Sequence, residues 1–242
     1  MNIQQLLAHV GNPRGHFAAK ENRAAKLVLM WPDIKKKMET LLLRGGGTSE
    51  TARHAYGVLL MMETGIRIGN ESSAEGFVCE NKFSPYFGQT VKTYGLTTLL
   101  GQHVRLEDGD LFVDFVGKKG VEQCLRTDHP LLVKHLPDVF PTQPLLNITE
   151  NSLRKFIHRY IGGKFKAKDL RTAKVNIEFA KVMSSPLHGE AFLNATSKSG
   201  RKKAVANAIE EVAQFIGHTK GVCRSAYISC HVLTFLTLTP QV

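Results

Sequence analysis

The sequence predicts a mainly α-helical protein with one small three-stranded antiparallel β-sheet, an α+β fold. Apolar residues recur at helical spacing in several separate stretches, whereas clear strand patterns are confined to residues 103–127. The 242 residues, 43% hydrophobic and 22% charged, are enough for one sizeable domain or a small lobe with a larger one. We divide the chain into a basic helical segment, residues 1–44, and a main domain, residues 45–242.

The amino-terminal segment is basic and helical in character, with a break predicted at Trp31-Pro32 because proline interrupts helices. Three glycines, residues 45–47, then form a flexible joint. Thr48 or Ser49 can cap the helix that follows. We therefore expect a docking or wrapping segment joined flexibly to the main domain.

The first helix of the main domain ends at Gly65, and Arg67 follows at once between Ile66 and Ile68. An arginine between two apolar residues needs a hydrogen-bonding or ionic partner if it is buried. Without further context, an internal salt bridge is the simplest partner for Arg67.

The strands are predicted at residues 103–107, 110–116 and 121–127. Asp108-Gly109 between the first two is a strong hairpin signal, and residues 117–120 (GKKG) make a second tight turn. Lysines in a turn are ordinarily only solvated. A narrow basic hairpin can also bring an ammonium group to a DNA phosphate, and this makes Lys118 and Lys119 candidates.

A proline-rich loop precedes a helix at residues 151–161, and another helix begins near Lys168. This places Arg171 in a first helical turn, where it can join backbone N–H groups in holding an anion. A local ion pair with Asp169 is the alternative.

The carboxyl-terminal part combines a loosely ordered loop, residues 184–200, with an amphipathic helix, residues 201–216. His218 follows that helix, and Tyr227 lies nine residues later in a further predicted helix. A phenol is a poor nucleophile unless nearby cations favour its ionised form. The tail from residue 234 is ambiguous between helix and strand.

The formal charge of +11 and the pI of about 9.6 suggest a polyanionic partner, with nucleic acid first and an anionic membrane surface second. The chain has no apolar run of membrane-spanning length and no signal-peptide layout, so we expect an intracellular, non-secreted protein. The four cysteines fit no metal-ligand spacing and are expected reduced and mostly buried. That spacing gives no reason to expect a metal, and the absence of a phosphate-binding glycine motif means that nothing points to a nucleotide cofactor, so we expect neither a metal nor a cofactor.

Five residues at predicted element boundaries form a chemically coherent set: Arg67, Lys118, Arg171, His218 and Tyr227. They offer a nucleophile, cationic donors for phosphate oxygens, and a lysine able to protonate a leaving group. That set suits transesterification at a phosphodiester.

Between about residues 56 and 233 the sequence resembles the poxvirus and bacterial type IB DNA topoisomerases. Six segments in the family's order carry the resemblance: TGIRIGNE (64–71), YGLTTLLGQHVRLEDG (94–109), FVGKKGVE (115–122), KDLRTAKVN (168–176), KKAVANAIEEVAQFIGHT (202–219) and VCRSAYISCHVL (222–233).

The resemblance implies the core fold shared by these DNA breaking and rejoining enzymes. It also implies that Tyr227 attacks the scissile phosphate to form a 3′-phosphotyrosyl bond, while Arg67, Arg171 and His218 stabilise the transition state. Lys118 matches the family's general acid for the departing 5′-oxygen. Relaxation would need neither ATP nor an obligatory metal.

We expect the partner to be double-stranded DNA, no membrane to be involved, and the protein to be a monomer. Further DNA contacts are expected from Tyr94, Lys119, Lys168 and Arg224.

Two departures from the family pattern stand out. We expect no counterpart of the family's β-rich amino-terminal domain in this sequence, since the residues before the catalytic part are few and look helical. In addition, His218 follows the poxvirus version, whereas many bacterial relatives carry asparagine, which is also a hydrogen-bond donor.

Two rival functions stay open. A tyrosine recombinase also places a histidine nine residues before its tyrosine, but typically has histidine where this chain has Lys168. A non-catalytic DNA-binding module would need only the positive charge, and it predicts no particular residue at position 227.

Overall fold

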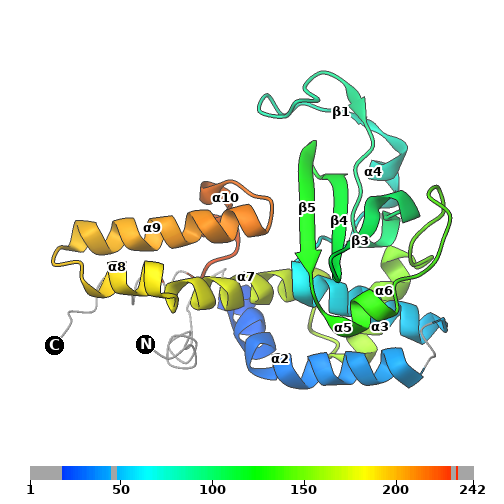
Figure 1. Cartoon of the computed structure of the whole chain (residues 1–242), viewed down its shortest axis with the longest axis horizontal. Helices are drawn as coiled ribbons and strands as arrows, with labels where there is room; N and C mark the ends of the chain where they lie inside the picture. The colour runs from blue at the N-terminus through cyan, green and yellow to red at the C-terminus, as the bar shows by residue number, and fades with distance from the viewer. Residues whose placement is uncertain (1–17, 45–47, 230–232, 234–242) are drawn as a thin grey trace. The chain divides into compact units, whose positions relative to one another are not determined.

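The computed structural model describes residues 18–44, 48–229 and 233 (Figure 1). It is mainly helical with a small antiparallel sheet, as predicted. In chain order the elements are α2 (Ala18–Arg44), α3 (Glu50–Thr64), α4 (Glu71–Glu75), β1 (Phe77–Val78), β2 (Thr90–Val91), η1 (Leu96–Thr98), η2 (Gly101–His103), β3 (Val104–Glu107), β4 (Asp110–Gly117), β5 (Val121–Thr127), α5 (Pro130–Lys134), α6 (Glu150–Tyr160), α7 (Ala167–Met183), η3 (Pro186–Glu190), α8 (Ala191–Leu193), α9 (Lys198–Phe215) and α10 (Lys220–Ala226).

The chain divides into two compact units. We call Trp31–Arg171 the sheet unit, and Met1–Met30 together with Thr172–Val242 the terminal unit. Each unit boundary falls inside a helix, α2 in one case and α7 in the other. The predicted joint at residues 45–47 and the tail from residue 234 lie outside the described residues.

The three predicted strands are confirmed. They form an antiparallel sheet of order β3-β4-β5 with Phe112 of β4 between Arg105 of β3 and Arg126 of β5. Asp108 and Gly109 join β3 to β4 with φ angles of 52° and 85°, which the Asp-Gly pair tolerates well. The structure adds the short antiparallel pair β1-β2. Two-residue strands are too short to show an alternating pattern in a sequence.

The core of the sheet unit is built around α3. The Ser49 hydroxyl accepts a hydrogen bond from the Ala52 N–H at 3.1 Å, and Gly65 ends the helix with a φ of 68°, so both predicted boundaries are confirmed. Most of α3 is buried. Its Tyr56 donates to the Leu132 carbonyl of α5 at 3.0 Å, and burial raises the pKa of this phenol.

The break predicted at Trp31-Pro32 is wrong, because α2 runs without interruption through Pro32. Proline removes one helical hydrogen bond, but Ile34, Met38 and Leu42 follow at four-residue spacing and are all buried. Packing of that face outweighs the single lost bond.

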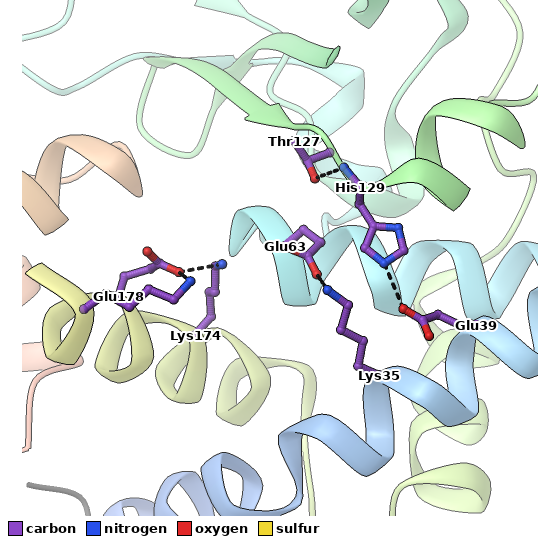
Figure 2. A network of polar contacts seen from close by, with 8 residues as sticks. Lys35, Glu39, Glu63, Thr127, His129, Lys174 and Glu178 are labelled. Carbon is purple, nitrogen blue, oxygen red and sulfur yellow. Dashed lines mark hydrogen bonds and ion pairs between the residues drawn. The ribbon is translucent and has the colours of Figure 1, made fainter. Parts of the chain in front are cut away.

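Polar contacts tie this stretch of α2 to its neighbours in the sheet unit (Figure 2). Lys35 Nζ lies 2.7 Å from a Glu63 carboxylate oxygen of α3, and His129 Nε2 lies 3.0 Å from Glu39 Oε1. The His129 N–H in turn donates to the Thr127 hydroxyl at the end of β5.

The terminal unit packs α7, α8, α9 and α10 around one apolar core. Its buried members include Phe179 and Met183 of α7, Phe192 of α8, and Ile209 and Val212 of α9. In α7, Lys174 Nζ lies 2.8 Å from a Glu178 carboxylate oxygen (Figure 2).

The loosely ordered loop expected at residues 184–200 is wrong, since η3, α8 and the start of α9 occupy most of it. Ser185 caps η3 and Ser197 caps α9 through their side chains. Serine is common in loops, but it also starts helices by accepting a hydrogen bond from a backbone N–H of the first turn. Phe192 is buried in the apolar core of the terminal unit, and this packing stabilises the short helix α8.

Candidate active site

The turn between β4 and β5 presents the two predicted lysines. Lys118 and Lys119 are both exposed, and the Gly120 N–H donates to the Gly117 carbonyl at 3.1 Å to close the turn. Lys119 has a φ of 66°, a left-handed conformation that is uncommon for a residue with a side chain. The sheet therefore carries an ammonium pair at its tip.

Arg171 and the segment before Arg67 meet in the sheet unit. Arg171 Nη1 donates to the Gly65 carbonyl, and the arginine is only 4% exposed. It is the fifth residue of α7, so it lies about one residue past the first helical turn in which it was expected. Its buried guanidinium is anchored two residues from Arg67, which is half-buried.

Backbone contacts hold Arg67 in place. The Leu96 N–H donates to the Arg67 carbonyl at 2.8 Å, and the Thr97 N–H donates to the Ile68 carbonyl at 2.8 Å. Gly95 approaches so closely that a Cβ on it would lie 2.6 Å from the Gly69 Cα. The TGIRIGNE and YGLTTL segments are thus directly packed against each other.

Three of the residues expected to contact DNA differ from one another in how exposed they are. Lys168 lies exposed on α7, one turn before Arg171, and Arg224 lies exposed on α10. Tyr94 is half-buried, and its ring lies 4.2 Å from that of His103, whose pKa is lowered by burial. The Tyr94 N–H donates to the Val116 carbonyl of β4.

His218 and Tyr227 are brought together in the terminal unit. Their ring centroids lie 5.3 Å apart with an interplanar angle of 40°. Gly217, with a φ of 61°, turns the chain after α9, and the His218 N–H donates to the Ala213 carbonyl at 2.8 Å. Tyr227 caps the carboxyl end of α10 instead of lying within that helix, which corrects the expectation.

Asn176 is a residue of this site that the sequence reasoning missed. Its Nδ2 donates to the Tyr227 carbonyl at 2.9 Å, and its Oδ1 accepts from the Ser229 N–H at 3.2 Å. An asparagine inside a helix and on its buried face calls for a partner, and that was the available signal.

Tyr227 is enclosed within the terminal unit. The residue is 8% exposed, and it borders a cavity of about 20 Å³ that is also lined by Glu21 and Ala25 of α2. A space of that size holds about one water molecule.

Each unit thus holds part of the predicted set. The sheet unit contains Arg67, Lys118 and Arg171, and the terminal unit pairs His218 with Tyr227.

Among the described residues, no three His, Cys, Asp or Glu side chains cluster as metal ligands would. Of the cysteines there, Cys79 and Cys223 are buried and Cys124 is exposed. Within the same described ranges, no helix has the length and apolarity needed to cross a membrane.

Known proteins resemble this chain over most of its length. The sequence model of the family described as eukaryotic DNA topoisomerase I, catalytic core, matches residues 18–233. DNA topoisomerase 1B of Acanthamoeba polyphaga mimivirus is 23% identical over 166 residues, covering 62% of this chain and 48% of that protein.

Two poxvirus proteins match a longer stretch. DNA topoisomerase I of Monkeypox virus and DNA topoisomerase 1B of Vaccinia virus (strain Western Reserve) are each 27% identical over 236 residues, covering 91% of this chain and 68% of theirs. The chain therefore spans between about half and two thirds of the length of these relatives.

Proposed function

The chain belongs to the family of eukaryotic DNA topoisomerase I catalytic cores, and we propose that it relaxes supercoiled DNA as a type IB topoisomerase. The observation that carries the proposal is the pairing of the His218 and Tyr227 rings, 5.3 Å apart, inside the region that the family matches. All five proposed catalytic residues come from one chain, so a monomer suffices. The proposed substrate is double-stranded DNA, and the proposed location is inside the cell.

The reaction exchanges one phosphodiester for another. The Tyr227 hydroxyl gives up its proton to water and its oxygen bonds to the scissile phosphorus, while the bond from phosphorus to the 5′-oxygen breaks. Lys118 donates a proton to that oxygen, which leaves as a 5′-hydroxyl. Rotation of the free end then releases supercoils, and attack by the hydroxyl reverses every step.

Arg67, Arg171 and His218 act as donors to the non-bridging phosphate oxygens, where negative charge builds up in the transition state. Arg171 loses little conformational freedom when it binds a phosphate, because the Gly65 carbonyl already holds its guanidinium group. Lys118 is suited to proton donation by its exposed place at a hairpin tip. Tyr94, Lys119, Lys168 and Arg224 would add contacts to the DNA.

The enclosure of Tyr227 makes a local movement part of the proposal. Tyr227 as a residue is 8% exposed, and the cavity that it borders holds about one water, which is too small for a phosphodiester. DNA binding would therefore displace the first turns of α2 or the end of α10.

The test is relaxation of a supercoiled plasmid in EDTA without ATP, combined with detection of a covalent adduct on nicked DNA in SDS. We expect relaxation and an adduct with the wild-type protein, and neither with Tyr227→Phe. Binding without an adduct would point to a DNA-binding module, and strand exchange between two duplexes would point to a recombinase.

A further inference from the structure

The loop that joins β1 to β2, residues 79–89, lies against the turn between β4 and β5 (Figure 1). Asn81 Nδ2 donates to the Lys119 carbonyl at 3.1 Å, and the Cys79 thiol donates to the same oxygen at 3.6 Å. The Ser84 hydroxyl donates to the Gly120 carbonyl at 2.6 Å. Two consecutive carbonyl groups of the lysine-bearing turn are thus held by one loop.

This contact is tightly packed. Cys79 is fully buried and Ser84 is 8% exposed. A Cβ placed on Gly120 would lie 2.6 Å from Ser84 Oγ and 2.7 Å from Cys79 Sγ, closer than any side chain allows. The turn can approach the loop only because residue 120 is glycine, whose φ of 66° also favours that residue.

The 79–89 loop is itself held in shape by the same side chains. Asn81 Oδ1 accepts from the Phe83 N–H at 3.2 Å, and Ser84 Oγ accepts from the Tyr86 N–H at 3.1 Å. Backbone bonds from Cys79 to Gln89 and from Gly88 to Cys79 close the loop at its base. Asn81 and Ser84 therefore link a shaped loop to the turn.

The turn needs such support. Lys119 is held in the left-handed region with a φ of 66°, which costs a residue with a side chain on the order of 1 kcal/mol. Such conformations persist where the surroundings impose them. A second link follows in β5, where the Tyr86 hydroxyl donates to Glu122 Oε1 at 2.8 Å.

We propose that the 79–89 loop is a positioning element for proton donation, in which Asn81 and Ser84 fix the turn so that the Lys118 ammonium meets the departing 5′-oxygen. The inference rests on the proposed role of Lys118 as general acid. Proton transfer requires an approach of about 3 Å, and a displacement of about 1 Å can slow a reaction by about a hundredfold. A lysine on a long flexible stem depends on its backbone for such placement.

The experiment compares two leaving groups in single-turnover cleavage at saturating protein. One duplex carries the normal 5′-oxygen at the cleavage site, and the other carries a 5′-bridging sulfur. A thiol has a pKa of roughly 8.5 and departs as thiolate without a proton, so the sulfur substrate bypasses the general acid. A variant that acts through Lys118 must therefore recover on sulfur.

The test variant combines Asn81→Asp with Ser84→Ala. The aspartate keeps the acceptor for the Phe83 N–H but loses the donor to Lys119. The alanine loses both the donor to Gly120 and the acceptor for the Tyr86 N–H. We expect cleavage of the oxygen substrate to slow by about tenfold or more, and cleavage of the sulfur substrate to stay within about twofold of wild type. Should the double variant fail to fold, Ser84→Ala alone carries the same comparison with a smaller effect.

Two controls separate the possible outcomes. Phe83→Ala removes a ring that is 98% exposed in the same loop and should leave both rates unchanged. Lys118→Ala must lose cleavage on oxygen and recover on sulfur; failure there would overturn the role of Lys118, not that of the loop.

With Lys118→Ala rescued, a wild-type rate of the double variant on oxygen would reject the loop proposal. Equal slowing on both substrates would also reject it, because that pattern means general damage instead of lost proton donation.

Discussion

Asn176 holds the backbone of Tyr227, with 2.9 Å between its Nδ2 and the tyrosine carbonyl oxygen. The same side chain accepts from the Ser229 N–H, so one buried amide fixes the chain on both sides of residue 228. Helix α7 thereby positions the backbone of the proposed nucleophile through these two hydrogen bonds, neither of which involves the tyrosine hydroxyl.

Replacing Asn176 by alanine should therefore damage both stability and cleavage. It leaves a buried carbonyl and a buried N–H without this partner, which costs about 1–3 kcal/mol. We expect a lower midpoint in chemical denaturation and adduct formation slowed by about tenfold or more. Asn194→Ala, at an exposed helix end, is the matched control; unchanged cleavage in Asn176→Ala would mean that Tyr227 is positioned by other groups.

His218 is expected to act as a hydrogen-bond donor to phosphate. His218→Asn keeps a donor, whereas His218→Ala removes it, so the alanine variant should cleave about a hundredfold more slowly and the asparagine variant far less so. Rapid-quench cleavage of a suicide substrate measures both rates. Equal loss in the two variants would argue against the donor role.

Alanine substitutions of Arg171 and Lys118 should slow cleavage to a similar extent but change the stability of the protein by different amounts. Arg171 is buried and donates to the Gly65 carbonyl, so Arg171→Ala is expected to lose about 2 kcal/mol of stability as well as cleavage. Lys118 is exposed, so Lys118→Ala should change stability by less than about 0.5 kcal/mol.

Both variants should cleave about a hundredfold more slowly, the scale of one lost donor or proton donor. Denaturant unfolding and single-turnover cleavage, run on the same preparations, test the pair. A strongly destabilised Lys118→Ala, or an Arg171→Ala with wild-type stability, would contradict the assignment.

Gly95 should tolerate no side chain. An added Cβ would lie 2.6 Å from the Gly69 Cα and 2.9 Å from the Arg67 carbonyl oxygen, so backbone would have to move at the proposed catalytic arginine. We expect Gly95→Ala to lose more than about 1 kcal/mol of stability and to cleave DNA more slowly. Gly163→Ala, where a Cβ meets nothing within 4 Å, provides the matched control.

Glu178 should make the terminal unit sensitive to acid. Burial alone would raise the pKa of this carboxyl, but Lys174 at 2.8 Å and Lys181 at 3.0 Å outweigh burial and lower it. Because the folded-state pKa lies below the unfolded value of about 4.5, folding favours the ionised form. That stabilisation is present above the unfolded pKa and is lost as the pH falls through the folded-state pKa.

Glu178→Gln should therefore be less stable than wild type by about 3 kcal/mol at pH 7, since it removes the carboxylate that pairs with the buried Lys174, and the difference should shrink below about pH 4.5. Denaturant unfolding across that pH range measures it. Glu210→Gln, which removes an exposed pair with Lys220, should cost less than about 1 kcal/mol. A difference that stays constant with pH would exclude the carboxylate as its source.

The sequence by itself determined the features that depend on a few neighbouring residues. The Ser49 cap, the Gly65 stop, the Asp108-Gly109 hairpin and the order of the three strands were all predictable, because capping and turn chemistry act within four or five positions. The candidate catalytic residues could also be singled out from sequence by their chemistry and their places at element boundaries, but their individual roles came from the resemblance to a family.

Only the tertiary structure decided the features that join distant segments. The continuous helix through Pro32 and the pairing of Asn176 with Tyr227 are results of packing; a buried asparagine inside a helix signals that a partner is needed, but not that the partner is Tyr227. The 79–89 loop is the clearest case, because nothing in its own residues reveals that Asn81 and Ser84 hold a turn about 36 positions away. Such contacts form only once many weak, non-local interactions have brought the segments together, and a pattern within one short stretch of sequence cannot encode them.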